Sequence, residues 1–316
     1  MADWQPSANI ETLKKRAELF RKIRRFFDSR EIYEVDVPLL GARGVTDLHI
    51  DCIEARCKGD IHYLQSSPEY FMKRLLAAGS GDIYFLGKAF RDGEAGRRHN
   101  PEFTMLEWYR VGWDEHRLMD EVVELIRFLA GDEIAITKLD YRNAFHAALG
   151  VDPHTAELPE LQRLAAETAG SESFYEDRST CLDLIFSLKV EPKLPAGLTL
   201  IYGYPQCQAA LAKIESDAQG QLVARRFEAF LNGVELANGY FELTTADDQA
   251  QRFEKDREQR RESCKRDMQA DEKLLAALRA GFPNCAGVAL GVDRLLMQLL
   301  NTDSIESVNA FPFSRL

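Results

Sequence analysis

The chain lacks several features that mark common functional classes. No run of about 18 consecutive apolar residues occurs in its 316 residues, and no basic leader with an apolar core opens it, so we expect a cytoplasmic protein with no membrane contact. It has neither a G-x-x-x-x-G-K-[ST] loop nor a G-x-G-x-x-G after a strand, which excludes the two commonest nucleotide-binding motifs. Its six cysteines form no C-x-x-C pair, so we expect reduced thiols and no zinc site.

An excess of positive charge is also missing. The formal net charge is −11, which argues against a protein that binds nucleic acid over its whole surface. Only residues 11–30 are locally basic, with eight Lys or Arg against three Asp or Glu. A solvated helix face and a docking face for an acidic partner both fit this segment.

Periodicity and turn residues indicate an α+β fold, built on a mixed, mainly antiparallel sheet flanked by helices. We expect helices over 12–29 and 68–77, and strands over 32–37, 50–55, 61–64, 82–91 and 102–110. Residues 114–187 have a mostly helical pattern, which we interpret as an insertion or crossover within a single catalytic domain, 1–316. A strand near 198–203, a hairpin over 225–242 and a charged helix follow, and a strand over 288–290 leads into the last helix.

A polar loop between two predicted strands gathers cationic side chains. These are Arg91, Arg97, Arg98 and His99. Guanidinium forks match phosphate oxygens, so the loop suits a polyphosphate. On the returning strand, alternation places four side chains on one face: Phe103, Met105, Glu107 and Tyr109. That face either stacks a base at Phe103 and meets a second ligand at Tyr109, or belongs to the core.

Asn232-Gly233 predicts a two-residue type I′ turn. Counting outward from the turn, Phe230 opposes Glu235 and Glu228 opposes Ala237. Glu228 and Glu235 therefore share a face as diagonal neighbours, roughly 7–8 Å apart at Cα. The pair suits a Mg²⁺ ion that bridges nucleotide phosphates, although two solvated acids fit equally well. Glu242 would face away unless a bulge at residues 238–239 resets the alternation.

A glycine marks the start of the last helix. Gly291 permits close ligand approach at a helix N-terminus, where backbone N–H groups favour anions. Arg294 would project from the first turn of that helix.

These segments, in this order, resemble the class II aminoacyl-tRNA synthetases, most closely the lysyl-tRNA synthetase catalytic domain, from about residue 12 onward. The first helix and the strand that closes at Pro38 resemble motif 1, the dimer-forming element. Residues 90–109 resemble motif 2, and residues 287–296 resemble motif 3. The resemblance implies a homodimer whose antiparallel sheet encloses bent ATP.

The resemblance also implies residue roles. ATP would be bound by Arg91, Asp92, Gly93, Glu94, Arg98, His99, Asn100, Phe103, Glu235, Leu236, Gly291 and Arg294. Of these, Arg91, Glu235 and Arg294 would be catalytic. Arg91 would hold the α-phosphate, Arg98 and His99 would lie toward the γ-phosphate, and Phe103 and Arg294 would sandwich adenine. Mg²⁺ would be bound by Glu228 and Glu235. The amino acid would be bound by Ser67, Pro68, Glu69, Tyr109, Asn238, Glu242 and Ala289, with Glu69 and Glu242 pairing with its ammonium groups.

Several differences from the lysyl enzymes refine this expectation. There is no room for an N-terminal anticodon-binding OB domain, and residues 203–209 are similar to the lysyl-tRNA synthetase paralogues that attach (R)-β-lysine to a lysine side chain of elongation factor P. That similarity implies (R)-β-lysine or lysine as substrate, elongation factor P as partner and no tRNA. Ala289 stands where the lysyl enzymes have glycine, and its methyl group would reshape the pocket floor. Gly93 stands where an adenine-contacting glutamate is expected, which makes Glu94 its candidate replacement.

Two other hypotheses remain open on the residues. One is a truncated lysyl-tRNA synthetase-like ligase, and the other is a regulatory paralogue that binds an amino acid without turnover. Loss of the ATP-binding residues would be the sign of the second. The chain retains Arg91, Glu228, Glu235 and Arg294, which favours an enzyme.

Overall fold

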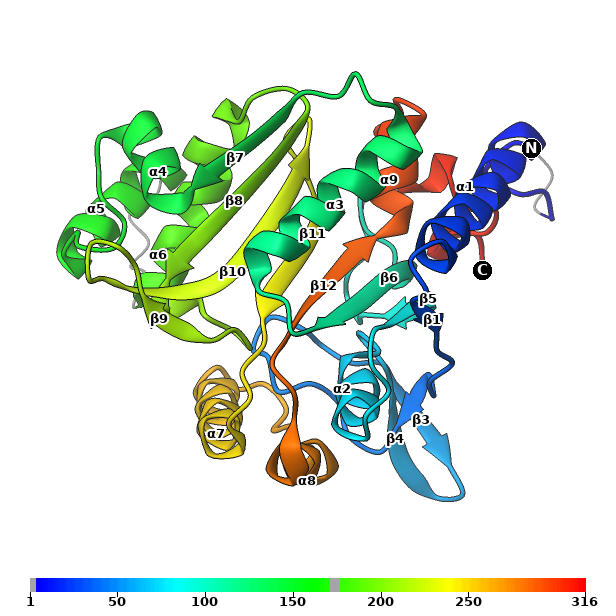
Figure 1. The fold of residues 1–316 in the computed structure, drawn as a ribbon, viewed down its shortest axis with the longest axis horizontal. Helices are drawn as coiled ribbons and strands as arrows, with labels where there is room; N and C mark the ends of the chain where they lie inside the picture. The colour runs from blue at the N-terminus through cyan, green and yellow to red at the C-terminus, as the bar shows by residue number, and fades with distance from the viewer. Residues whose placement is uncertain (1–3, 171–176) are drawn as a thin grey trace. The chain divides into compact units, whose positions relative to one another are not determined.

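The chain falls into two structural units, and residues 4–170 and 177–316 of the computed structural model are described (Figure 1). Unit 1 comprises Met1–Trp113, Phe128–Ala130 and Leu243–Leu316, and unit 2 comprises Asp114–Arg127 and Gly131–Glu242. The part of the predicted helical stretch at 171–176 lies outside the described residues. In the part of the chain that is described, no helix is both long enough and apolar enough to cross a membrane.

Unit 1 contains a mixed sheet in the order β1-β5-β6-β12. Its strands are β1 (Tyr33–Glu34), β5 (Ile83–Phe90), β6 (Glu102–Val111) and β12 (Cys285–Gly291). Strand β1 is parallel to β5, whereas β5, β6 and β12 pair antiparallel. Of the predicted strand over 32–37, Tyr33 and Glu34 form the strand, and the Val35 amide adds a hydrogen bond to the Tyr84 carbonyl at 2.8 Å.

Helix α1 (Ile10–Asp28) covers one face of this sheet. Asn9 caps its N-terminus by accepting a hydrogen bond from the Thr12 amide at 2.8 Å. Near its C-terminal end, the Phe27 ring stacks on Tyr84 of β5 at 4.4 Å and meets Trp108 of β6 at 5.4 Å between ring centroids. Because side chains alternate along a strand, the residues between these contacts face the opposite side of the sheet.

The rest of unit 1 is a small antiparallel sheet in the order β2-β4-β3 and four helices. These elements are β2 (Leu40–Gly41), β3 (Glu54–Cys57), β4 (Asp60–Leu64), α2 (Glu69–Ala77), α7 (Ala246–Glu262), α8 (Glu272–Gly281) and α9 (Val292–Leu299). The segment just before α1 lies beside the C-terminal segment (Figure 1), where the Ser7 amide donates to the Ala310 carbonyl at 2.8 Å. Helix α2 begins one residue later than predicted, with Pro68 at the position before it.

Unit 2 carries strands in the order β11-β10-β8-β7, with β9 beside β10. The strands are β7 (Ile136–Asp140), β8 (Leu198–Pro205), β9 (Ile214–Ser216), β10 (Leu222–Leu231) and β11 (Val234–Phe241). The helices are α3 (Glu115–Ala130, its last turn in unit 1), α4 (Tyr141–Leu149), α5 (Leu158–Ala169) and α6 (Arg178–Ile185), which a π-helical turn (Phe186–Val190) extends. The sequence did not predict β7, which pairs parallel with β8 inside the stretch expected to be helical.

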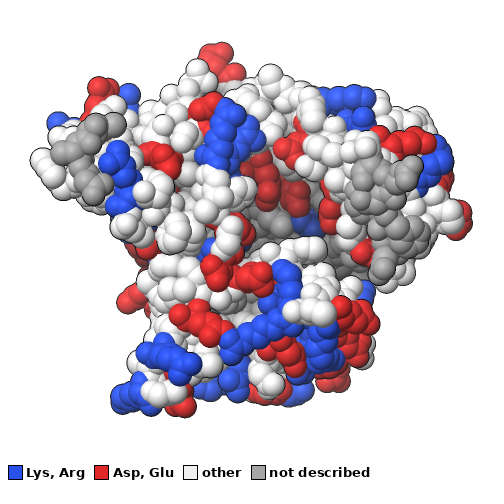
Figure 2. Space-filling model, turned by 180° about the vertical axis from the view of Figure 1, so that it is seen from behind, with Lys and Arg blue, Asp and Glu red and all other residues white. Residues whose placement is uncertain are grey.

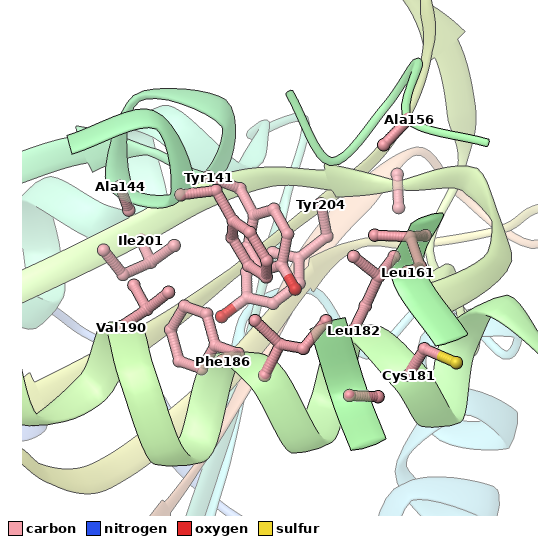
Figure 3. Close-up of a cluster of buried hydrophobic side chains, with 14 of the residues drawn as sticks. Tyr141, Ala144, Ala156, Leu161, Cys181, Leu182, Phe186, Val190, Ile201 and Tyr204 are labelled. Carbon is pink, nitrogen blue, oxygen red and sulfur yellow. The ribbon is translucent and has the colours of Figure 1, made fainter. Parts of the chain in front are cut away.

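An aromatic cluster forms the core of unit 2 (Figure 3). The rings of Tyr141 and Phe186 stack with centroids 5.3 Å apart, and Tyr204 lies 4.5 Å from Tyr141. Ile201 of β8 and Leu182 of α6 fill the space around them. The cluster attaches the helices to the sheet and leaves the Tyr204 hydroxyl close to β10.

The α+β class with a mixed, mainly antiparallel sheet is confirmed. The hairpin is confirmed as well, because Asn232 and Gly233 both have positive φ, at 51° and 71°, as a type I′ turn requires. The strand predicted over 50–55 is displaced and forms at Glu54–Cys57.

Candidate active site

The face of the unit 1 sheet opposite α1 collects the predicted substrate residues. Glu107 pairs with Phe85 on one side and with Ala289 on the other, while Tyr109 pairs with Gly287. Side chains of directly paired residues lie on the same face. The Ala289 methyl group therefore lies on the same face as Glu107 and Tyr109.

Glu107 is the centre of this face, and sequence reasoning gave it no role. Its side chain is buried, and its two oxygens accept hydrogen bonds from the Ser67 hydroxyl at 2.6 Å and the Tyr109 hydroxyl at 2.8 Å. Ser67 in turn accepts the Glu69 amide at 3.0 Å, which anchors the start of α2. Because this buried carboxylate lies beside two predicted substrate residues, it is a candidate partner for a cationic group of a ligand.

Glu69 already contacts a cation. Its carboxylate lies 2.7 Å from the Lys73 ammonium one helical turn along α2, and the Lys73 side chain is only 2% exposed. The prediction that Glu69 binds a substrate ammonium group stays a prediction. In this structure the Lys73 ammonium occupies one side of its carboxylate.

Arg91 lies at the start of the motif 2 loop, beside Phe103. Its guanidinium carbon is 5.2 Å from the Phe103 ring centroid, and its Nη1 lies 3.4 Å from Glu94. The Nε atom of Arg91 is buried without a hydrogen-bond partner among the described residues. A guanidinium with an unsatisfied buried donor suits an anionic ligand such as a phosphate.

Gly93 explains why the loop departs from the expected sequence. Its φ is +74°, in the left-handed region where a glutamate would be strained. The turn it makes is closed by Asp92, whose carboxylate accepts the Gly93 amide at 2.9 Å. It directs Glu94 toward Arg91, so in this structure Glu94 orients the arginine. Whether Glu94 also contacts adenine stays a prediction.

The other cations of this loop have different surroundings. Arg294, in the first turn of α9, contacts the His99 ring nitrogen, which brings the motif 2 and motif 3 segments together at these two residues. Arg97 pairs instead with Asp303. Arg98 is exposed and has no partner among the described residues, so its charge is available to a ligand.

Asn100 has a structural contact that the sequence did not predict. Its amide donates to the Glu102 carbonyl at 2.6 Å and accepts the Phe313 amide at 2.8 Å. The residue thus fixes the base of the loop against the C-terminal segment. Gly291 ends β12 and caps α9, as predicted for the helix start beneath Arg294.

In unit 2, a β-bulge corrects the predicted register of the hairpin. Phe230 pairs with Glu235 as predicted, but Ala229 pairs with Ala237 and Glu228 with Asn238, so the extra residue is Leu236. The prediction that Glu228 opposes Ala237 was wrong, because a bulge lies at Leu236; the alternative considered for Glu242 had placed a bulge at residues 238–239. The physical consequence was anticipated, because the shift places Asn238 and, by alternation, Glu242 on the face of Glu228.

Glu228 belongs to a hydrogen-bonded group with residues that sequence reasoning missed. The Tyr204 hydroxyl donates to it at 2.7 Å, and the Arg226 guanidinium donates to its other oxygen. Burial raises the pKa of Glu228 to about 7, Arg226 opposes that rise, and the nearby Glu235 carboxylate adds to it. Tyr204 comes from the 203–209 segment that carried the resemblance, so this segment has a contact with the predicted metal site.

The other predicted residues of this hairpin differ in burial. Glu235 and Asn238 are half-buried, whereas Leu236 and Glu242 are buried. The side-chain oxygen of Asn238 is itself buried and has no hydrogen-bond partner among the described residues. An unsatisfied buried acceptor beside two carboxylates fits a ligand that supplies N–H donors.

Comparison with known proteins identifies the family. The model for class II tRNA synthetases (D, K and N) matches residues 1–315. The chain belongs to the class II tRNA synthetase family. Among its curated relatives are the elongation factor P--(R)-beta-lysine ligases of Vibrio cholerae (47% identical, 99% of each chain covered), Vibrio parahaemolyticus (46%, 98% of each) and Yersinia pestis (47%, 98% of each).

Class II synthetases use ATP and Mg²⁺, and the residues present fit both. No group of three or more His, Cys, Asp or Glu that would hold a metal was found within residues 4–170 and 177–316. Mg²⁺ in nucleotide sites needs only one or two carboxylates, because substrate phosphates and water complete its octahedron. Glu228 and Glu235 are the predicted pair. In unit 1, Arg91, Arg98 and His99 are the predicted phosphate contacts, and Phe103 and Arg294 are the predicted adenine contacts.

Proposed function

We propose that this chain uses ATP to activate (R)-β-lysine as an aminoacyl-adenylate and transfers the aminoacyl group to a lysine side chain of elongation factor P. The relatives that are 46–47% identical over nearly their whole length carry the name of this activity. The observation in the structure that carries the proposal is the buried Glu107, with Ser67 and Tyr109, on the face beside Arg91 and Phe103.

The substrate class follows from the charges on that face. A lysine isomer carries two ammonium groups, and each needs an anionic or acceptor partner once it leaves water. Glu107 is the candidate for one of them, with the Tyr109 hydroxyl beside it. Glu69 on α2 of the same unit is the candidate for the other. Glu242 of unit 2 stays a predicted partner of an ammonium group, and the unsatisfied Asn238 oxygen of that unit is a candidate acceptor. In unit 1, the Ala289 methyl group lies on the face of Glu107, where it would narrow the pocket floor.

In the first step, a carboxylate oxygen of the amino acid attacks the α-phosphorus of ATP, and pyrophosphate leaves as the P–O bond to the β-phosphate breaks. Arg91 binds the α-phosphate and stabilises the charge that develops on it. Phe103 and Arg294 hold the adenine, so that the reacting atoms are aligned. Mg²⁺ bound at Glu228 and Glu235 would neutralise phosphate charge. No covalent enzyme intermediate is required.

In the second step, the neutral amine of the acceptor lysine attacks the acyl carbon, the bond to AMP breaks, and an amide forms. The amine must first lose a proton, and desolvation at the binding surface lowers the pKa of a lysine.

Three further proposals concern assembly and partners. We propose that both units form a single catalytic domain, that α1 forms a homodimer in the manner of motif 1, and that tRNA is not an acceptor. On the face drawn in Figure 2, Lys and Arg are interspersed with Asp and Glu, which disfavours binding of a nucleic-acid backbone to that face. The cytoplasmic location stays a prediction.

The activation step is tested by amino-acid-dependent exchange of labelled pyrophosphate into ATP. We expect exchange with (R)-β-lysine. The exchange rate with lysine should be lower by about 10-fold or more, the discrimination expected from one misplaced contact the size of a methylene group. Exchange with neither amino acid, in protein that still binds ATP, would favour the regulatory paralogue and contradict the proposed function.

A further inference from the structure

Arg16 of α1 makes contacts that the proposed function does not use. Its Nη1 donates to the Asp293 carboxylate at 2.5 Å, and its Nη2 donates to the Thr104 hydroxyl at 2.7 Å. The Arg16 side chain is 14% exposed and that of Asp293 is 2% exposed. One guanidinium therefore joins three elements of unit 1: the first helix, the motif 2 strand β6 and the motif 3 helix α9.

The contact between Asp293 and Thr104 has a clear cause in the sheet. Strand β12 ends at Gly291, which pairs with Met105, so Thr104, the residue before Met105 on β6, has no partner on β12. The second oxygen of Asp293 accepts the Thr104 amide at 2.7 Å and replaces the missing ladder bond. A carboxylate in the first turn of α9 is also favoured by the positive end of the helix dipole.

The two residues that Arg16 joins are neighbours of the two proposed adenine contacts. Thr104 follows Phe103, and Asp293 precedes Arg294. Thr104 alternates with Phe103 and so lies on the face that α1 covers, beneath the ligand face. We propose that Arg16 is a positioning residue, which sets the spacing of Phe103 and Arg294 for the adenine from behind the sheet. This inference rests on the proposed ATP site.

Arginine suits this position because its planar fork reaches two acceptors at once. Lysine would keep a positive charge near Asp293 but would contact only one partner at a time. Methionine would fill a similar volume and leave the buried Asp293 carboxylate without the cation beside it. The inference therefore predicts graded effects, with Arg16→Lys between the wild type and Arg16→Met.

The test is calorimetric titration of the full chain with ATP and Mg²⁺, together with pyrophosphate exchange. We expect Arg16→Met to weaken ATP binding and to raise the KM for ATP by about 10- to 100-fold, the loss typical of misplaced binding groups. The KM for the amino acid should stay unchanged, because Glu107 and Tyr109 do not contact Arg16. Arg16→Lys should lose only part of the ATP affinity.

Lys15→Met is the matched control. Lys15 precedes Arg16 on the same helix and is half-exposed. Its one ion pair among the described residues is with Glu11 of its own helix at 3.2 Å, so its variant should bind ATP as the wild type does. A double variant, Arg16→Met with Asp293→Asn, also removes the buried Asp293 charge that Arg16→Met leaves without a cation. Compared with Arg16→Met alone, it should regain more folding stability than ATP affinity.

The outcomes separate the two claims. If the wild type binds ATP and both Arg16 variants bind it equally well, with only a lower melting temperature, Arg16 is a structural residue and the inference fails. An equal rise in the KM for ATP and for the amino acid would also overturn it. If the wild type binds no ATP, the proposed function fails first, and the positioning role falls with it.

Discussion

Replacing Arg91 with alanine lowers the rate of pyrophosphate exchange by about 10²- to 10³-fold, the loss expected when a group that stabilises developing charge is removed. The Arg91 guanidinium lies over the Phe103 ring and donates a hydrogen bond to Glu94, which orients it. Its Nε donor is buried and has no partner among the described residues. Because the charge on the α-phosphate grows as the new bond forms, the loss should appear mainly in kcat. Exchange kinetics at saturating ATP and amino acid measure it.

Arg97 provides the control for this prediction. It comes from the same loop and carries the same charge, but its guanidinium pairs with Asp303 and is 65% exposed. Arg97→Ala should therefore stay within a few-fold of the wild-type rate, and Arg91→Lys should lie between the two alanine variants because it keeps the charge without the fork. Equal losses in Arg91→Ala and Arg97→Ala would mean that loop charge alone matters, and would contradict a specific role for Arg91.

Replacing Glu228 or Glu235 with glutamine should raise the Mg²⁺ concentration needed for half-maximal exchange by at least about 10- to 100-fold, the range that even outer-shell changes cause. Each substitution removes the negative charge of one of the two proposed Mg²⁺ ligands. Titration of exchange activity with Mg²⁺ at fixed ATP measures the shift. Glu215→Gln is a suitable control, because Glu215 pairs with Arg225 on β10 and is half-exposed. Unchanged Mg²⁺ dependence in both site variants would place the metal elsewhere.

The Glu228 carboxylate should make the stability of the metal-free protein depend on pH. Burial raises the pKa of Glu228 to about 7, above its ordinary value, so the folded state binds more protons than the unfolded state between about pH 4.5 and 7. The free energy of unfolding should therefore fall as pH rises through this window, by up to about 3 kcal/mol. Urea unfolding in a chelator should show that Glu228→Gln gains stability relative to wild type from pH 5 to pH 8. A difference that does not change with pH would contradict the raised pKa.

The hairpin illustrates what local sequence determines and where it stops. A type I′ turn requires positive φ at both central residues, and Asn and Gly adopt positive φ readily. This preference predicted the turn and the pairing of Phe230 with Glu235 next to it. The bulge at Leu236 has no such local signature, because an apolar residue without glycine can form it. Every pairing beyond the bulge therefore differs from the predicted register by one residue.

Two omissions have a similar origin. Strand β7 pairs only with β8, from about 60 residues further along the chain, and its alternating pattern is short enough to be lost among helices. Glu107 was placed on one face of β6 with Phe103, Met105 and Tyr109, but it was given no role. The signal that could have singled it out is an acid between Met, Leu, Trp and Tyr on an apolar strand, since such an acid is rarely buried without a partner.

Single candidate residues predicted less about function than did the order of the three motif-like segments along the chain. Arg91, Arg98 and His99 indicated a phosphate-binding loop, and Gly291 with Arg294 indicated a helix start near an anion, but each is weak when taken alone. Their order along one chain resembled the class II synthetases, and the family match over residues 1–315 confirms this. Contacts such as Arg16 with Asp293, which are 277 positions apart, are not visible in any local pattern.

The central claim is that the activated amino acid goes to a protein. The most direct measurement offers purified elongation factor P and bulk tRNA together to the chain, with ATP, Mg²⁺ and (R)-β-lysine, and follows the mass of the protein and the acylation of the tRNA. The account predicts a mass increase of one aminoacyl group on elongation factor P, with the label on a lysine side chain and none on tRNA. Acylated tRNA with unmodified elongation factor P would contradict it.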